Sequence, residues 1–463
     1  MEVAQAILER LPATLVLASS GFAAAIAFGA LIGFVRARAR VPVLRNALAL
    51  LQLVFRATPV FVLALLLPFT MVTMSLPPQA GAPSAESFDL ASRLRYAIAP
   101  VLCLALPFGA WASLIFYDFF RASDGAGRAP TLRAVGPIAL SAAAIGPALL
   151  TATLIVEPMA AWPGMARLFY SGLSQHDRGL IAGCLLAYLI AVVLLKLAAR
   201  FSHSMPQVSQ PPRQGVSPIG IIAFGVLLAA VVGAVAANLI APVGPNFIDQ
   251  AHWMGYPLAP GVAGHPLGTD ESGRDLLARL LFGLRTSLVI AAVAAVIATA
   301  IAALVAKATT ARPWFARGTL YGIGIRAFAA LPFILAVSVL ARKTQPAILS
   351  SLGIALIIGV VAWPAIVPAL RVRTRGTLGA VVDLAACALL LEVTLSSFGA
   401  GVQPPTPSLG NMFANALSDI PLAPWIPIAS ALVVVGTLFA LYALADELRE
   451  MGSGSLVPSA KRP

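Results

Sequence analysis

Charged residues are scarce in this sequence. Only 11 % of its 463 residues are Asp, Glu, Lys or Arg, whereas 59 % are hydrophobic. A soluble domain carries about 25 % charged residues, because its surface must be hydrated. A chain this poor in charge cannot cover a core with hydrated surface, so a soluble globular protein is excluded.

Cysteine and histidine are also rare. The three cysteines, Cys103, Cys184 and Cys387, lie inside apolar blocks and lack the paired spacing of metal ligands. The four histidines are scattered and form no HExxH motif or His/Cys cluster; they are His176, His203, His252 and His265. We therefore expect no metal, no cofactor and no catalytic site in the chain.

Lysine occurs only at positions 196, 307, 343 and 461, and none of these residues follows a glycine. The phosphate-binding pattern GxxxxGK[ST], in which a glycine-rich loop precedes the lysine, does not occur in the sequence. The chain therefore carries no ATPase motif of its own.

Basic residues nevertheless outnumber acidic ones, and the formal net charge is +13. They lie in short loops between apolar blocks and do not form one patch with interleaved aromatic residues. This distribution is typical of the positive-inside rule for cytoplasmic loops of membrane proteins. It favours the lipid bilayer as the chain's environment and argues against nucleic acid as a partner.

The apolar blocks are about 20 residues long or longer, which is the length a helix needs to cross about 30 Å of hydrocarbon. An open sheet would leave backbone groups unpaired in lipid. We predict an all-α, polytopic membrane protein with about 11 transmembrane helices. The predicted spans are 13–35, 47–76, 96–119, 134–156, 178–199, 217–241, 285–306, 318–341, 346–369, 377–398 and 425–445. The first has no basic start and no small-residue cleavage site, so we expect a retained span and not a signal peptide.

Eleven spans place the two termini on opposite sides of the membrane. Most Lys and Arg residues fall in the cytoplasm if the group Arg36, Arg38, Arg40 and Arg45 is cytoplasmic. This predicts an N-terminus outside and a C-terminus inside. Residues 201–216, rich in Pro, Ser and Gln, are predicted to be a cytoplasmic linker. They separate a first membrane half (1–200) from a second (217–450), which a cytoplasmic tail (451–463) follows.

The two halves share short patterns, which is informative because transporters are often built from repeats. RATPVFVLA at 56–64 and RAFAALPFILA at 326–336 each place an Arg before a Pro-interrupted apolar run. LIVEPMAAWPGM at 154–165 and LLLEVTLSSFGAG at 389–401 each place a Glu where a span meets its outer loop.

A longer motif precedes the seventh predicted span, HPLGTDESGRDLLARLLFGLRTSL at 265–288. Gly268 and Gly273 permit turns, Asp270 can cap the following helix, and the leucines after Asp275 recur at helical spacing as in an amphipathic interfacial segment. The motif resembles the signature of C-type permease subunits in the dipeptide, oligopeptide and nickel ABC importer family. SSFGAGVQPPTPSLGNMF at 396–413 resembles the last outer loop of the same subunit.

The first half is similar to the partner B-type subunit of that family. ILERLPATLVLA at 7–18 resembles its segment entering the second helix, and VEPMAAWPGMARLF at 156–169 resembles its outer loop. The chain thus resembles a B-type subunit fused to a C-type subunit, beginning where the family has already made one helix. This accounts for five spans before the linker.

The resemblance implies a permease that moves peptides or similar small solutes inward across the bacterial cytoplasmic (inner) membrane. The substrate path would lie between the two halves. Separate ABC ATPase subunits would supply the energy, and an extracytoplasmic solute-binding protein would deliver the substrate. The loop with His265, Gly268, Asp270, Gly273, Arg274 and Asp275 would help to receive that protein.

The sequence departs from the family in its cytoplasmic coupling loops. The segments that correspond to the family's long coupling loops, 119–133 and 371–377, are short, and neither contains the EAA…G pattern. Two alternatives therefore stay open. One is a permease-derived scaffold or regulator without ATPase coupling, and the other is an ion-coupled secondary transporter.

Ionisable residues within spans are costly and therefore invite functional hypotheses. The candidates for the transport path are Asp383, Arg56, Arg326, Glu157 and Glu392. Asp383 lies deepest in its span and would carry the ion in a secondary transporter. Arg56 and Arg326 could instead snorkel to the cytoplasmic edge, and Glu157 and Glu392 could serve helix ends. For His265, Asp270 and Asp275, a cap-and-turn role is favoured over a metal site.

Overall fold

The structure is a computed structural model that describes residues 2–65, 90–123, 135–175, 177–198, 216–252, 255–311, 351–363, 366, 370, 376–399, 401–413 and 422–452. The only β pairings in these ranges are two isolated bridges, and all regular elements are helices. The predicted all-α class is confirmed. Seven described helices are long and apolar enough to cross a membrane, or up to eight if the bent pair within 136–159 is one span. The predicted span 318–341 and residues 66–76 of the second span lie outside the described residues, so the count of 11 stays a prediction.

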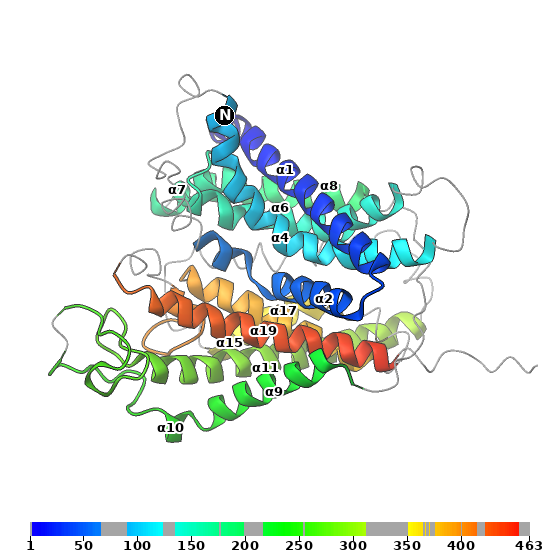
Figure 1. The fold of residues 1–463 in the computed structure, drawn as a ribbon. Coiled ribbons are helices and arrows are strands. Elements are labelled where there is room, and N and C mark those ends of the chain that lie inside the picture. Colours follow the sequence, from blue (N-terminus) through cyan, green and yellow to red (C-terminus); the bar gives the residue numbers. More distant parts are fainter. Residues whose placement is uncertain are drawn as a thin grey trace, which may run out of the picture. The chain divides into compact units, whose positions relative to one another are not determined.

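The chain forms two compact units, Met1–Val208 and Ser209–Pro463, and the division falls within the range expected to be a linker. The first unit contains α1 (Glu2–Arg38), α2 (Pro42–Ala57), α4 (Leu90–Ser123), α6 (Val135–Met159), α7 (Met165–Gln175) and α8 (Arg178–Ala198). In this unit α1 packs along α4, and both contact α6 (Figure 1).

Small residues let α1 and α4 approach closely. A Cβ atom at Gly29 would lie 2.8 Å from Ala112 Cβ, and one at Gly33 would lie 2.8 Å from Phe116 Cβ. Gly109 of α4 is equally crowded by Phe28 and Ala25. This is the small-residue packing that holds helices together in lipid, where the hydrophobic effect gives no attraction between them.

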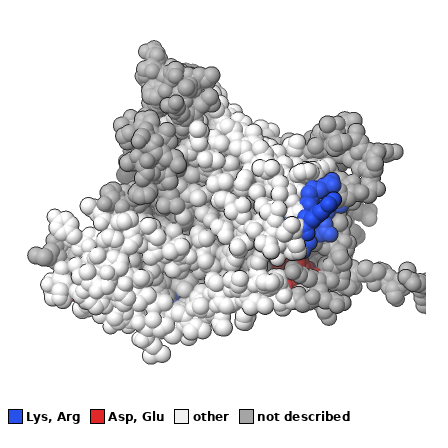
Figure 2. Space-filling view, viewed as in Figure 1, with Lys and Arg blue, Asp and Glu red and all other residues white. Residues whose placement is uncertain are grey.

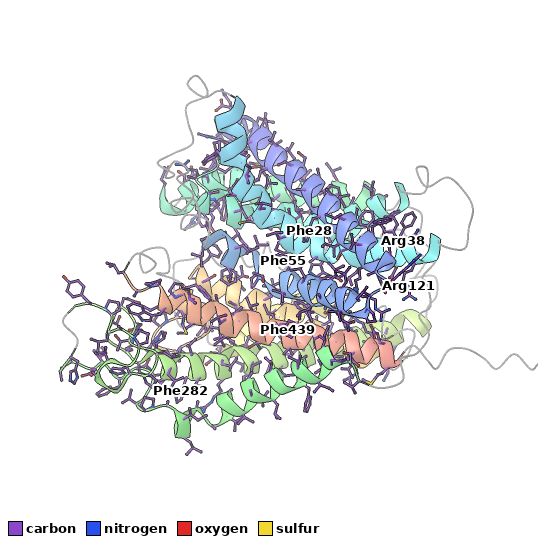
Figure 3. The ribbon with its side chains drawn as sticks, in the orientation of Figure 1. Phe28, Arg38, Phe55, Arg121, Phe282 and Phe439 are labelled. Atoms are coloured by element: carbon purple, nitrogen blue, oxygen red, sulfur yellow. The ribbon has the colours of Figure 1, made fainter. Side chains whose placement is uncertain are left out.

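The helix α2 ends at Ala57, before Thr58 and Pro59, where the chain turns and a further helical stretch begins. Proline has no N–H to continue the helical ladder. Phe28 of α1 meets Phe55 of α2 edge to face, with ring centroids 5.7 Å apart (Figure 3). The predicted Pro-interrupted span in this region is therefore a broken helix.

The second unit contains α9 (Pro218–Val235), α10 (Ala237–Ile240), α11 (Leu276–Ala311), α15 (Ser351–Ala362), α17 (Gly376–Ser397) and α19 (Trp425–Gly452), with short 3-10 turns η2 (Val262–Gly264) and η4 (Asn411–Phe413). Figure 1 shows its long helices running side by side. One core cluster joins α11, α17 and the segment after α15 through Ala295, Ala298, Ala302, Ile366 and Leu384.

The first and last helices of this unit are tied together by a buried glutamate. Glu447 of α19 accepts hydrogen bonds from the backbone N–H of Ser217 at 2.9 Å and from its hydroxyl at 2.7 Å. The Ser217 hydroxyl oxygen in turn accepts the N–H of Gly220 at 2.8 Å and so caps α9.

The same packing pattern recurs in both units. In the first, α1 packs on α4 and α6, and α6 packs on α8. In the second, α11 packs on α15 and α17, and α17 packs on α19. The order along the chain is the same, so α1, α4, α6 and α8 correspond to α11, α15, α17 and α19. Among the described helices of the first unit, none corresponds to α9.

Candidate functional site

Glu157 lies at the end of α6 with no exposed surface. Its Oε2 atom accepts the backbone N–H of Ala166 at 2.7 Å, across the turn between α6 and α7. The neighbouring N–H of Met165 donates to the hydroxyl of Thr14 in α1 at 2.8 Å, and that hydroxyl lies beside the Glu157 carboxyl. We call Thr14, Glu157, Met165 and Ala166 the first latch, because together they hold this turn against α1.

The turn between α6 and α7 has little freedom. A Cβ atom at Gly164 would collide with the carboxyl of Glu157. Trp162 donates its Nε1–H to the carbonyl of Ala13 at 2.9 Å, and its ring stacks on Tyr96 with centroids 5.7 Å apart. Position 164 therefore requires glycine. The turn is held by contacts with α1 and α4 as well as with α6.

Glu392 takes the corresponding place at the end of α17 and is also fully buried. It accepts the hydroxyl of Ser396 at 2.7 Å, and the Ser396 oxygen accepts the N–H of Val402 at 3.0 Å. The N–H of Leu409 donates to the hydroxyl of Ser287 in α11 at 3.1 Å, and Ser287 also lies beside the Glu392 carboxyl. We call Ser287, Glu392, Ser396 and Leu409 the second latch.

The two hydroxyl residues escaped the sequence analysis. A serine or threonine in an apolar run carries no motif, and the available signal was the likeness between TLVLA at 14–18 and SLVIA at 287–291. In both stretches the hydroxyl residue and the position three residues later, Leu17 or Ile290, are buried. The shared stretches therefore occupy the same place in α1 and α11.

The loop at 241–275 is organised around His265, which is 4 % exposed. Its Nδ1 lies 2.7 Å from Asp275 Oδ2, and its Nε2 lies 3.3 Å from Asp249 Oδ2. Burial by itself lowers the pKa of His265, but the hydrogen bonds and charges of Asp275 and Asp249 outweigh burial and raise that pKa above its ordinary value. The imidazole therefore joins two distant parts of the loop.

Asp275, and not Asp270, caps α11. Its Oδ1 accepts the N–H of Ala278 at 2.7 Å, as an N-cap does. Asp270, which was predicted to cap the helix, instead accepts the backbone N–H groups of Ser272 and Arg274 within the preceding turn. The correction follows from the start of α11 at Leu276, directly after Asp275.

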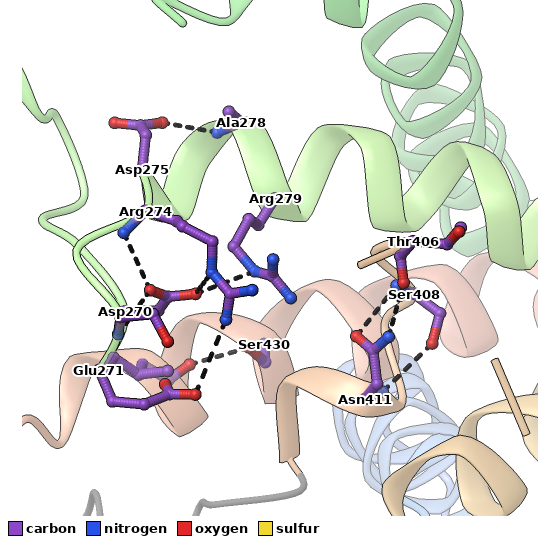
Figure 4. A network of polar contacts seen from close by, with 12 residues as sticks. Asp270, Glu271, Arg274, Asp275, Ala278, Arg279, Thr406, Ser408, Asn411 and Ser430 are labelled. Atoms are coloured by element: carbon purple, nitrogen blue, oxygen red, sulfur yellow. Dashed lines mark hydrogen bonds and ion pairs between the residues drawn. The ribbon is translucent and has the colours of Figure 1, made fainter. Parts of the chain in front are cut away.

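Asp270 also joins two arginines (Figure 4). Its Oδ2 lies 2.7 Å from Arg274 Nε and 3.1 Å from Nε of Arg279, one turn into α11. Asp270 and Arg279 are 3 % and 4 % exposed, and this charged pair fixes the turn to the helix. Gly268 and Gly273 have φ angles of 78° and 77°, so both sit in the left-handed region that favours glycine.

Arg56 lies in the last turn of α2 and is 5 % exposed. Its guanidinium carbon is 4.8 Å from the ring centroid of Trp111 in α4, which is a cation–π distance. A cation also suits the carbonyl end of a helix. Arg326, the corresponding candidate of the second half, lies outside the described residues.

Asp383 lies in α17, where its Oδ2 is 2.7 Å from Arg449 Nη2 of α19. The Arg449 side chain is 41 % exposed. The structure thus pairs Asp383 with a cation and does not bring it together with Glu392, the other described path candidate of its unit. The four described path candidates fall into separate places: two latches, one helix break and one ion pair.

No protein-family profile matches the chain. The chain is 29 % identical over 262 residues to the di/tripeptide transport system permease protein DppC of Pseudomonas aeruginosa, covering 48 % of this chain and 84 % of the relative. It is 29 % identical over 249 residues to the oligopeptide transport system permease protein OppC of Escherichia coli K12, covering 46 % and 80 %.

A further relative is the probable peptide ABC transporter permease protein y4tQ of Sinorhizobium fredii. Identity is 31 % over 218 residues, which covers 40 % of this chain and 72 % of the relative. Most of the relative's length is thus matched at this identity. The chain belongs to the family of peptide ABC transporter permeases.

Proposed function

We propose that this chain is the transmembrane component of an ATP-driven importer that moves peptides or similar small solutes into the cell. The observation that carries the proposal is its similarity to the peptide permeases of Pseudomonas aeruginosa, Sinorhizobium fredii and Escherichia coli. Energy comes from separate ABC ATPase subunits, since the sequence has no phosphate-binding loop.

The chain joins a B-type and a C-type permease end to end, and three observations support this part of the proposal. Each match covers 72–97 % of a relative but only 40–56 % of this chain, as expected if one relative corresponds to about half of it. The order of packed helices repeats in the two units. Each unit also carries a latch, with Glu157 or Glu392 opposite a hydroxyl of the corresponding helix.

The latches lie toward the extracytoplasmic side in this proposal. Figure 2 shows Lys and Arg side chains gathered in a patch on the surface, and the last turns of α1 and α4 carry Arg36, Arg38 and Arg121. Figure 3 places Arg38 and Arg121 close together. Basic residues favour the cytoplasmic face, and Thr14 lies toward the other end of α1. The N-terminus is then outside, the C-terminus is cytoplasmic, and the protein resides in the inner membrane.

The loop at 241–275 would then face the extracytoplasmic solute-binding protein, with His265, Asp270, Asp275 and Arg279 keeping its shape. The broken helix at Pro59 would contribute to the path, since interrupted helices in transporters line substrate sites. Arg56, beside this break, would be a candidate to meet an anionic group of a substrate. Of the segments 119–133 and 371–377, where ATPase contacts would be expected, residues 124–133 and 371–375 lie outside the described residues.

The proposal is tested by purification from native membranes in a gentle detergent, followed by reconstitution into proteoliposomes. We expect ATP-binding subunits to co-purify in stoichiometric amount, and ATPase activity to rise when the loaded binding protein is added. A related intact importer, purified in parallel, is the control for the conditions. If no ATPase co-purifies while that control stays assembled, or if uptake proceeds without ATP and stops when the proton gradient is abolished, the importer proposal is wrong.

A further inference from the structure

The two latches share a helix hydroxyl that accepts a backbone N–H, although their sequences differ. In each, a helix hydroxyl accepts one backbone N–H of the loop: Thr14 accepts Met165, and Ser287 accepts Leu409. The hydroxyl belongs to α1 or to its counterpart α11, and the glutamate lies at the end of α6 or its counterpart α17. The hydroxyl bond is thus common to both units, but the glutamates differ. Glu157 accepts the backbone N–H of Ala166 directly, whereas Glu392 reaches the N–H of Val402 through the Ser396 hydroxyl.

The hydroxyls and carboxyls of the latches are as buried as any residues of the units. Thr14, Glu157, Ser287 and Glu392 each have 0 % exposed surface. One carboxyl oxygen in each latch, Glu157 Oε1 or Glu392 Oε2, makes no hydrogen bond to the described residues. Burying a carboxyl group with one unpaired oxygen costs folding free energy. Stability of the fold alone therefore does not explain why each unit has such a carboxyl group.

We propose that Glu157 and Glu392, each with its partner hydroxyl, are equivalent positioning residues that fix the two outer loops for contact with the substrate-delivery protein. The inference rests on the proposed function for its transport consequence. Thr14 anchors the turn between α6 and α7 directly to α1, and Ser287 anchors the segment after α17 directly to α11. Release of a latch would remove one of the contacts that fix its loop, without unfolding the helices.

If the two latches are equivalent, serine and threonine should each work at either hydroxyl position. Thr14→Ser and Ser287→Thr keep the hydroxyl and should preserve the latches, whereas Thr14→Val and Ser287→Ala remove it. Ser20→Ala in α1 and Thr299→Ala in α11 are matched controls, because these hydroxyls bond only carbonyls of their own helices.

The first measurement is residue-resolved hydrogen exchange of the complete chain in detergent, which does not depend on transport. We expect Thr14→Val to speed exchange of the Met165 amide about tenfold, the factor that about 1.4 kcal/mol gives, and to leave the second latch unchanged. Ser287→Ala should do the same to Leu409 alone. Unchanged exchange in these variants, or equal acceleration in the controls, would overturn the latches.

The second measurement is ATPase stimulation by loaded binding protein in proteoliposomes. We expect Thr14→Val and Ser287→Ala to raise the binding-protein concentration for half-maximal stimulation at least threefold, with the maximal rate nearly unchanged and with recovery in the Ser and Thr variants. If exchange changes but this concentration does not, the latches are structural only and the positioning role is wrong. If the variants show the expected exchange pattern but the wild type shows no stimulation, the latches stand and the importer proposal fails instead.

Discussion

Replacing Gly29 by Ala should destabilise the first unit by pushing α1 away from α4. The added Cβ would lie 2.8 Å from both Ala112 Cβ and the carbonyl oxygen of Gly109. Carbon atoms in contact normally sit about 3.5–4.0 Å apart. One of the obstructing atoms belongs to the backbone and cannot rotate aside, so the two helices must separate by roughly 1 Å.

The expected cost follows from two opposing terms. Overpacking a tight contact costs about 1–3 kcal/mol. Alanine is a better helix former than glycine by up to about 1 kcal/mol, which offsets part of that cost. The net loss is therefore about 1–2 kcal/mol, or roughly a tenfold shift in the unfolding equilibrium.

The assay is unfolding of the purified protein in mixed micelles with rising SDS, followed by the loss of helical signal. Gly225→Ala is the control, because no atom lies within 4 Å of a Cβ built at that position of α9. This variant should gain up to about 1 kcal/mol from helix propensity alone. If both substitutions shift unfolding in the same direction by the same amount, close packing does not set the α1–α4 distance.

The remaining predictions concern the charged contacts. Folding raises the pKa of His265, so protonated His265 stabilises the loop fully below the ordinary histidine pKa of about 6.5. This stabilisation is lost as the pH rises through the higher pKa of the folded state. Hydrogen exchange of 241–275 should quicken over that pH interval, and His265→Gln should abolish the pH dependence. Asp275→Ala removes the cap of α11 and should lower stability by about 1–2 kcal/mol in the SDS assay, while Asp275→Asn, which can still cap, should lose less. Asp383→Asn should cost less than about 1 kcal/mol, since Arg449 is 41 % exposed; a double-mutant cycle with Arg449→Gln that gives a clearly larger coupling would show that water does not screen this pair.

The sequence predicted the positions of two spans well, because the thickness of the hydrocarbon layer fixes the length of an apolar block. The expected spans 178–199 and 377–398 correspond closely to α8 and α17. Helix ends were predicted less well, because local hydrogen bonds determine where a helix begins and ends. The seventh span was predicted to start at residue 285, but α11 begins at Leu276, where Asp275 caps it and the leucines expected at the interface continue directly into the span.

Some residues of the candidate site could be predicted from the sequence and others could not. Glu157 and Glu392 could be singled out because a buried carboxyl stands out in an apolar sequence. Their partners Thr14 and Ser287 could not, since a hydroxyl costs little in a helix that can satisfy it internally. Arg279 was missed because it lies in the leucine-rich helical part of the motif, and only the fold of the preceding turn brings it to Asp270.

The bond between Glu447 and Ser217 has a consequence for how such a chain could arise or be divided. The second unit completes the start of α9 with a carboxylate from its own last helix, so it needs nothing from the residues before Ser217 to cap that start. A gene cut within codons 201–216 would leave this closure intact in the downstream polypeptide. Joining or separating the two units at that point would therefore change the gene without disturbing the hydrogen bonds that cap α9.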